Sequence, residues 1–507
     1  MGSDTRKTGG LVGDSVVYGL GAAITAAVAF LLIPLYTSVL PKAEYGRLQL
    51  INTTAEVLAL VMLAGARQAF IRFYFDDTDE AWHRKLMGTT AVLVVITSIG
   101  IGLLFMPFRN LLATVLLDDP RLTFLFNLVL LWIPFEIVFG LGLALLQVRR
   151  RPGLFISLSV VKFTLVIVSN IALVYYYRRG IEGVLFTNAC VAVVFGTAVL
   201  VYFLVKSRLL VSISLAKKLL RFGLPFLPTA FALFVIVSCP QYVLKSSAGL
   251  GSVGIFALAA KISMVGTILV VEPFGKVWTP FIFQNFRRPD GPQVIGRGFT
   301  LFCRVSIGVA LAVSIAAPIV IPFLAGKVEY HEAATSGLIP ILCVGLLFYG
   351  LASASDVGIL IEKKTYLKPR LVIPAVVASA ISNVVLVPIL HEYGAALATL
   401  IAYFLLFLMT LIVSRRYYRF TLELREILGS LFVAGFVYGL FEALYHVLPP
   451  GSKMWAIGVF LLYLAVEAPR WRRHGALRPP LDEVKKPGST QDVPMQPALR
   501  DDERHWT

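Results

Sequence analysis

Residues 39–62, VLPKAEYGRLQLINTTAEVLALVM, lead from a short polar turn into a long apolar run, and this order recurs later in the chain. At a shift of 208 positions, Tyr45-Gly46 falls on Val253-Gly254 within AGLGSVGIFALAAKISMVGTILVV (248–271). Each of the two stretches joins the first apolar helix of a set to the second. The repeat therefore predicts two related halves, helices one to six and seven to twelve. An even number of crossings in each half makes both halves point the same way.

The composition of the 507 residues is that of a membrane protein. Hydrophobic residues make up 58% and charged residues only 15%, with a mean hydropathy of +0.81, whereas soluble proteins carry roughly 25% charged residues. About fourteen stretches reach the length of roughly 20 apolar residues that a helix needs to cross a bilayer. They lie near 14–39, 47–75, 85–107, 121–148, 153–177, 181–205, 222–245, 252–285, 296–325, 333–361, 371–390, 393–414, 427–447 and 453–469.

These stretches predict an all-α, polytopic integral membrane protein with two pseudo-symmetric six-helix bundles and two additional C-terminal helices. The expected parts are a cytoplasmic N-terminus (1–12), an N-terminal six-helix bundle (13–205), a basic cytoplasmic linker (206–221), a C-terminal six-helix bundle (222–416), two further helices (417–470) and a tail (471–507). The tail is polar and rich in proline, which is typical of a disordered segment. No loop is long enough to fold as a domain outside the membrane.

The net charge of +17 and the pI of 9.7 are explained by where the basic residues lie. With the N-terminus inside, the cytoplasmic loops collect Arg149, Arg150, Arg151, Lys206, Arg208, Lys217, Lys218, Lys363, Lys364, Lys368, Arg370, Arg415, Arg416, Arg419, Arg472 and Arg473. The opposite loops hold far fewer. Because basic residues mark the cytoplasmic side of a membrane protein, we expect both termini in the cytoplasm and no binding to nucleic acid.

Four segments carry a resemblance to a known family. They are YGLGAAITAAVAFLLIPLYTSVLPKAEYGRLQL (18–50), LAGARQAFIRFYFDD (63–77), YVLKSSAGLGSVGIFALAAKISMV (242–265) and VWTPFIFQNF (277–286). With them the chain resembles, over about residues 11 to 470, the polysaccharide transporter branch of the multidrug/oligosaccharidyl-lipid/polysaccharide exporter superfamily. Its members are the bacterial flippases of O-antigen and capsule repeat units.

The resemblance implies two six-helix bundles in a V shape, a central cavity, and an undecaprenyl-diphosphate-linked oligosaccharide as cargo. It also implies a bacterial inner-membrane location, with a polysaccharide polymerase and glycosyltransferases of the same pathway as possible partners. Some branches of the family use the two extra helices to hold a lipid tail. No cofactor and no metal are expected.

Six basic residues lie inside predicted spans: Arg67, Arg72, Lys162, Lys261, Lys276 and Arg304. A charge at mid-membrane costs at least about 2.5 to 3.5 kcal/mol, so each one is a candidate for function. Arg67 and Lys276 occupy nearly equivalent positions of the repeat, one in each half, and could grip a diphosphate across a cavity. The alternatives are that long side chains near helix ends reach the interface, and that Lys276 only pairs with Glu272, four residues earlier.

Three carboxylates inside the predicted spans, Glu56, Glu136 and Asp356, are candidates for coupling transport to a proton. Glu56 and Arg67 are eleven residues apart, which places them on one face of a helix. Lys261 and Glu272 repeat this spacing with the signs exchanged. The alternative is that each carboxylate is paired or neutral and only fixes the packing of helices.

Three other functions stay open. A cation-coupled multidrug and toxin exporter of the same fold is expected to present acidic and aromatic cavity residues rather than six cations. A peptidoglycan-precursor lipid flippase shares both fold and cargo chemistry. A membrane enzyme that uses lipid-linked sugar is disfavoured, because the six histidines are scattered without metal-ligand spacing and no nucleophile stands beside a base.

Overall fold

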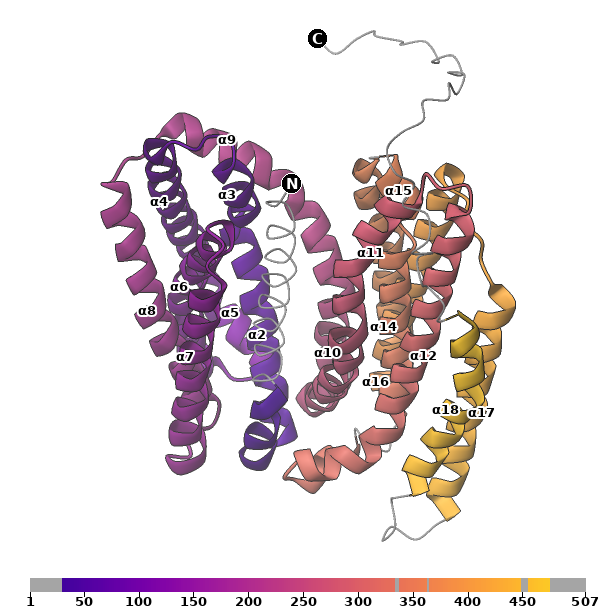
Figure 1. Cartoon of the computed structure of the whole chain (residues 1–507). Helices are drawn as coiled ribbons and strands as arrows, with labels where there is room; N and C mark the ends of the chain where they lie inside the picture. The colour runs from indigo at the N-terminus through magenta and orange to yellow at the C-terminus, as the bar shows by residue number, and fades with distance from the viewer. Residues whose placement is uncertain (1–29, 333–336, 363, 448–454, 475–507) are drawn as a thin grey trace, which may run out of the picture.

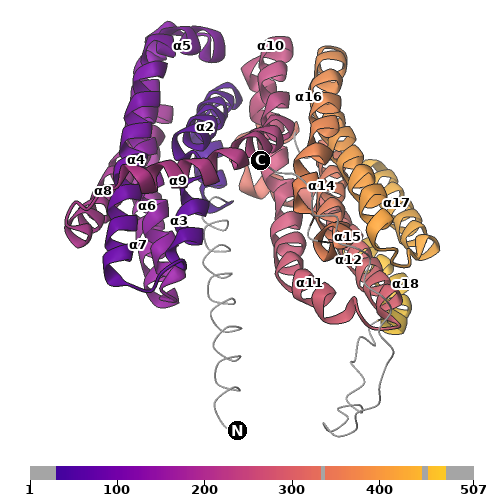
Figure 2. The same cartoon turned by 90° about the horizontal axis from the view of Figure 1, so that it is seen from above.

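The computed structural model describes residues 30–332, 337–362, 364–447 and 455–474, which are helical throughout with short connections. Its helices gather into two bundles that stand side by side, with the pair α17–α18 outside the second bundle (Figure 1). Viewed from above, the first bundle and the second lie on opposite sides, with α9 running across the first (Figure 2). The expected N-terminal segment 1–12 and nearly all of the tail after 471 lie outside the described residues.

The described part of the first bundle begins with the apolar helix Phe30–Val39. It continues with α2 (Lys42–Leu63), α3 (Ala66–Tyr74), α4 (Glu80–Phe105), α5 (Arg109–Leu117), α6 (Thr123–Val148), α7 (Pro152–Asn170) and α8 (Gly180–Ser207). Helices α2 and α3 form one crossing bent by 43°. The bend lies at Gly65, whose φ of +71° is a conformation that favours glycine.

The second bundle consists of two very long helices and the helices between them. Its elements are α10 (Leu227–Gly266), α11 (Glu272–Asn285), α12 (Gly291–Leu324), α14 (Leu338–Ala354), α15 (Val357–Ile361) and α16 (Lys368–Tyr417), followed by α17 (Leu424–Val447) and α18 (Trp455–His474). Helix α10 breaks at Gly249, with φ of +83°, and α16 breaks at His391, with φ of +49°. Each break separates two of the crossings expected from sequence.

The predicted membrane fold is confirmed. In the described part of the chain, nine helical stretches are long and apolar enough to cross a membrane, or ten with the bent pair α2–α3. Two of the nine, Ala230–Asn285 and Lys368–Tyr417, hold two expected crossings each. Together with α18, these stretches contain crossings two to fourteen, and Phe30–Val39 is the described part of the first.

The basic segment 206–221, expected to be a cytoplasmic linker, contains most of the helix α9 (Ile213–Gly223). Ser212 caps this helix by accepting a hydrogen bond from the backbone N–H of Leu215. Leu215 and Leu219, one turn apart, are buried against the first bundle. We call the end of the bundles that carries α9 the linker end, and the end that carries the break at Gly249 the hairpin end.

The two bundles are joined at the hairpin end. Helix α2 packs along both arms of α10, with Gly46 against Gly254 at the crossing. Tyr330 Oη donates a hydrogen bond of 2.9 Å to the backbone carbonyl of Leu40, and Lys327 donates one to the carbonyl of Val39. These contacts hold the bundles together at one end of the molecule.

Candidate functional site

A row of polar contacts crosses between the bundles along α2 and α10. Thr53 Oγ1 donates a hydrogen bond of 3.0 Å to Gln241 Oε1, and both side chains are buried. Gln241 lies just over two helical turns before the break at Gly249 that marks the hairpin end. Beside it, the hydroxyls of Thr54 and Tyr242 are 3.1 Å apart. Buried polar groups need partners, so the bundles satisfy each other's hydrogen bonds here. We call this row the seam.

Lys261 and Glu56, predicted as separate candidates, lie on α10 and α2, the two helices that form the seam. Lys261 Nζ donates to Tyr45 Oη at 3.1 Å and lies 5.1 Å from the centre of the Tyr45 ring. Glu56 of α2 interacts with Lys261 through longer-range electrostatics, without an ion pair among the described residues. Tyr45 in turn packs edge-on against Tyr330, with ring centres 5.9 Å apart. A cation of one half of the repeat is thus bonded to a tyrosine of the other.

Arg67 and Lys276 stand nearer the linker end, one in each bundle. Arg67 lies in the first turn of α3 and Lys276 in α11, and Figure 1 shows both helices at the same end of opposite bundles. Both side chains are exposed. Arg67 donates only a long hydrogen bond of 3.4 Å to Gln147. Within the described residues Lys276 forms no ion pair, not even with Glu272, so the two cations are not neutralised by protein carboxylates.

Arg72 and Lys162 are each paired inside the first bundle. Arg72 is exposed and pairs with Asp76 one turn later, at the end of α3. Lys162 is buried, lies 4.3 Å from the centre of the Phe139 ring, and donates to Glu136 at 2.6 Å. The Glu136 side chain is 49% exposed. This ion pair joins α6 to α7, and its two charges neutralise each other.

Arg304 lies away from both the seam and Arg67. It is fully buried on α12, and its Nε and Nη2 donate to Glu467 Oε2 of α18 at 3.1 and 2.7 Å. Ser430 of α17 donates to the same oxygen at 3.0 Å, and Glu426 lies 3.8 Å from Arg304. The sequence prediction places Arg304 in the substrate cavity. The structure places it in an ion pair that fastens α17 and α18 to the second bundle.

Glu467 was missed in the sequence, although a signal was present. It is the single carboxylate of the apolar stretch 453–469, and it is as fully buried as Arg304. Asp356, the third candidate carboxylate, lies between α14 and α15 and pairs with Lys368 at 2.6 Å. Of the three predicted carboxylates, only Glu56 lies between the bundles.

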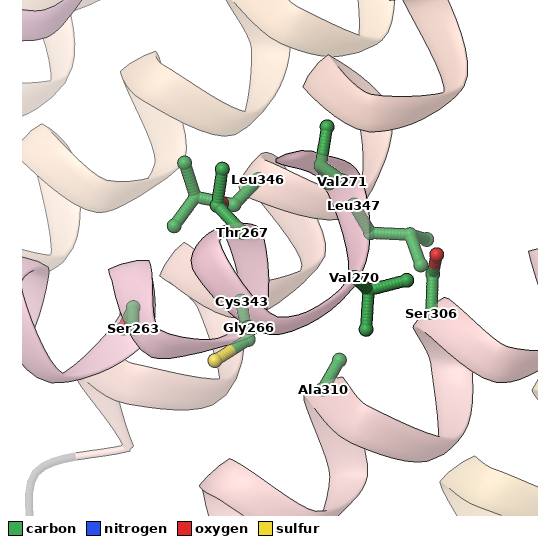
Figure 3. A pocket seen from close by; sticks show the side chains of 10 residues that line it. All are labelled: Ser263, Gly266, Thr267, Val270, Val271, Ser306, Ala310, Cys343, Leu346 and Leu347. Atoms are coloured by element: carbon green, nitrogen blue, oxygen red, sulfur yellow. The ribbon is translucent and has the colours of Figure 1, made fainter. Parts of the chain in front are cut away.

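A small cavity lies inside the second bundle, between α10, α12 and α14 (Figure 3). Its volume of about 20 Å³ has room for one water molecule rather than for a substrate. One wall is the π-helical segment Thr267–Val271. The buried hydroxyls of Thr267 and Ser306 lack a hydrogen-bond partner in the described structure. Among those same residues, no three His, Cys, Asp or Glu side chains gather as metal ligands.

Comparison with known proteins places this arrangement in a family. The family model described as "Polysaccharide biosynthesis protein" matches residues 11–286. Among solved structures, the lipid II flippase MurJ in an inward closed conformation is similar, with a TM-score of 0.75, 14% identity, and coverage of 90% of this chain and 99% of that one. No curated protein sequence matches the chain.

Two further structures share the fold at lower similarity. An inward-facing multidrug resistance MATE family transporter of the MOP superfamily has a TM-score of 0.63 and 15% identity, and covers 77% of this chain and 94% of its own. A MOP superfamily transporter from Pyrococcus furiosus has a TM-score of 0.56 and 16% identity, and covers 80% and 95%. The chain belongs to the polysaccharide biosynthesis protein family, and it is a multi-pass membrane protein with the fold that MurJ and the MATE transporters share.

Proposed function

We propose that this transporter moves a polyprenyl-diphosphate-linked oligosaccharide from the cytoplasmic to the outer face of a bacterial inner membrane. The proposal rests on membership in a polysaccharide biosynthesis family together with one observation. The bundles are joined along a polar seam at the hairpin end, while Arg67 and Lys276 stay exposed nearer the linker end, one in each bundle. A cavity that opens at one end and closes at the other is what alternating access requires.

The basic loops support an orientation. Arg149 bonds to Tyr74 at the end of α3, Lys368 pairs with Asp356 just before α15, and Arg415 follows Ser414, which bonds to Gly358 of α15. Helices α3 and α15 lie at the end that carries α9 (Figure 1). Basic loops mark the cytoplasmic side, so the linker end faces the cytoplasm in this proposal. Arg67 and Lys276 then face the side on which the lipid-linked sugar is made. The polymerase and glycosyltransferases of such a pathway are the partners that this function implies.

The transport cycle needs no covalent chemistry. The diphosphate enters from the linker end and is bound by Arg67, which can grip two oxygens, and by Lys276, which acts as a point charge. The sugars fill the space between the bundles while the polyprenyl tail stays in lipid. When the bundles rock apart at the hairpin end, the hydrogen bond of Lys261 to Tyr45 must break, and the electrostatic attraction between Lys261 and Glu56 weakens. Lys261 is then the next cation on the path of the diphosphate.

Glu56 is the carboxylate best placed to respond to a coupling proton. It lies in the seam, whereas Glu136 and Asp356 are paired within one bundle. Protonation of Glu56 would remove its attraction for Lys261 and so favour opening of the seam. The membrane potential would also assist outward movement of the cargo, by about 4.6 kcal/mol per 100 mV for two negative charges.

A drug exporter is the second candidate, because MATE transporters share the fold. The residues do not favour it. An exporter of organic cations is expected to carry unpaired carboxylates in its cavity, whereas here the unpaired exposed charges near the linker end include Arg67 and Lys276.

The test is flipping of a fluorescent polyprenyl-diphosphate oligosaccharide in proteoliposomes. The wild type is compared with Arg67→Ala and Lys276→Ala, and with Arg72→Ala as a matched control from the same helix as Arg67. Flipping by the wild type and the control, with strong loss in the other two variants, is the expected result. Efflux of organic cations without any flipping would move the assignment to a drug exporter.

A further inference from the structure

A polar recess lies at the hairpin end of the first bundle, away from the seam. Its volume is about 520 Å³, within the range of roughly 300 to 1,000 Å³ that small-molecule sites occupy. It is bounded by the turn before α2, the turn before α6 and the turn before α8. The lining residues of the last two turns lie between the spans that end at 117 and 176 and those that begin at 120 and 180, so the recess opens at the membrane surface.

The lining carries equal numbers of basic and acidic side chains. They are Arg47, Arg178, Arg179, Glu44, Asp119 and Glu182. No two of these six described residues form an ion pair, although all of them border the same space. Arg47 donates to the carbonyl of Leu117, and Asp119 accepts from a backbone N–H. Most of the remaining donors and acceptors therefore face the recess or water.

The equal numbers of basic and acidic side chains favour some classes of ligand over others. A multiply charged anion such as a diphosphate would meet three carboxylates as well as three guanidinium groups. A polyhydroxylated ligand both donates and accepts, so it can use carboxylates as acceptors and guanidinium groups as donors at once. Glu44 and Glu182 also lie in the first turns of α2 and α8, where they offset the helix dipoles. Arg178 and Arg179 have no such role at a helix N-terminus.

We infer that the recess binds a glycan, the oligosaccharide part of the cargo, on the face opposite Arg67 and Lys276. The identity of the glycan rests on the proposed function. Helix α2 connects the recess to the seam, because Glu44 and Arg47 line the recess while Tyr45 and Gly46 contact α10.

The probe is the pool of water-soluble oligosaccharides that mild acid releases from the polyprenyl-linked lipids of the cells that make the protein. Full-length protein in nanodiscs is incubated with this pool, washed, and the retained glycan is measured by mass spectrometry. We compare the wild type with the double variant Arg178→Ala/Arg179→Ala and with Glu182→Gln, which keeps the shape of the side chain. Arg109→Ala is the matched control, since Arg109 is half-buried and bonds to Asn127 outside the recess.

Wild type and Arg109→Ala should retain one oligosaccharide. Both recess variants should retain at least about tenfold less oligosaccharide than the wild type, and a tenfold loss of affinity corresponds to about 1.4 kcal/mol of binding free energy. Their melting temperatures should be unchanged. Retention of nothing, or equal retention by all variants, overturns the inference. Flipping measured on the same preparations separates the two proposals. Flipping without retention overturns the recess alone, and retention that depends on Arg178 and Arg179 without flipping leaves the recess standing and removes the proposed function.

Discussion

Gly46 of the first half and Gly254 of the second, matched by the internal repeat, pack against each other where the two bundles meet. A Cβ on Gly46 would lie 2.0 Å from the carbonyl oxygen of Leu250 and 3.1 Å from the backbone nitrogen of Gly254. A Cβ on Gly254 would lie 2.1 Å from the carbonyl oxygen of Lys42. The backbones of α2 and α10 are therefore in contact, as at the small-residue crossings of other membrane helices.

Alanine at either glycine should force the bundles apart at the hairpin end. The obstructing atoms are backbone, which cannot turn aside, so Gly46→Ala and Gly254→Ala should each destabilise the protein by about 1 to 3 kcal/mol. The measurement is the melting temperature of purified protein, together with the flipping rate.

Gly100→Ala is the control for this prediction. Gly100 also lies inside a membrane helix, α4, but nothing approaches within 4 Å of an added Cβ. If Gly46→Ala and Gly100→Ala melt alike, the close contact of α2 with α10 does not exist in the protein.

The crossings and the equivalence of Gly46 and Gly254 could be predicted from sequence, because both depend on patterns that repeat. Apolar runs of membrane length give the helices, and a shift of 208 positions aligns the two glycines. That the two glycines touch depends on how α2 packs against α10, which the repeat does not specify. Leu215 and Leu219, four residues apart, carry a signal for helix α9 within the basic linker.

The partners of the buried charges could not be predicted. The cost of burying a charge marks Lys261 and Arg304 equally, but it does not say which helix lies opposite. Arg304 meets Glu467, 163 positions away, whereas Lys261 meets Tyr45, 216 positions away in the other bundle. Only the packing of the helices shows whether a buried charge fastens helices within one bundle, as Arg304 does, or lies at the interface between the bundles, as Lys261 does.

The ion pair Arg304–Glu467 should stabilise the fold, and its loss should not change the rate of transport in protein that remains folded. Arg304→Ala leaves the fully buried Glu467 without its cation, which should cost about 3 to 5 kcal/mol. The double variant Arg304→Met/Glu467→Leu removes both charges and should recover most of the loss, since a buried pair replaced by apolar groups is often neutral. Melting temperatures of the three proteins measure this.

Arg72→Ala serves as the reference for the buried pair. Its ion pair with Asp76 is exposed, so its loss should change stability by at most about 1 kcal/mol. At a temperature where all variants remain folded, flipping by Arg304→Met/Glu467→Leu should match the wild type. Loss of flipping in that folded double variant would instead place Arg304 on the substrate path.

Lys261 and Glu56 should show energetic coupling across the bundles. Lys261→Met and Glu56→Gln each remove one side of the interaction, so the double variant should cost less than the sum of the two. For directly interacting residues the difference is about 0.5 to 3 kcal/mol, and the lower end of this range is expected here because Lys261 and Glu56 attract each other without an ion pair. The flipping rates of the four proteins give this value. Strict additivity would mean that the seam opens without separating the two side chains.

Arg67 and Lys276 should control both the rate of flipping and its dependence on membrane potential. Loss of a charge-assisted hydrogen bond costs about 1.5 to 3 kcal/mol, so Arg67→Ala should slow flipping about 10- to 100-fold. The flipping rate of Arg67→Lys should lie between those of the wild type and Arg67→Ala, because lysine keeps the charge but cannot form two parallel hydrogen bonds to the diphosphate.

With a potential imposed by a potassium gradient and valinomycin, a negative interior should speed outward flipping by the wild type. Each charge moved contributes up to about 2.3 kcal/mol per 100 mV, so a cargo with two negative charges gives a steeper response than one whose charge the protein cancels. If Arg67→Ala flips at the wild-type rate, the two exposed cations do not bind the diphosphate. A wild-type rate that ignores the potential would mean that the cargo crosses without moving net charge.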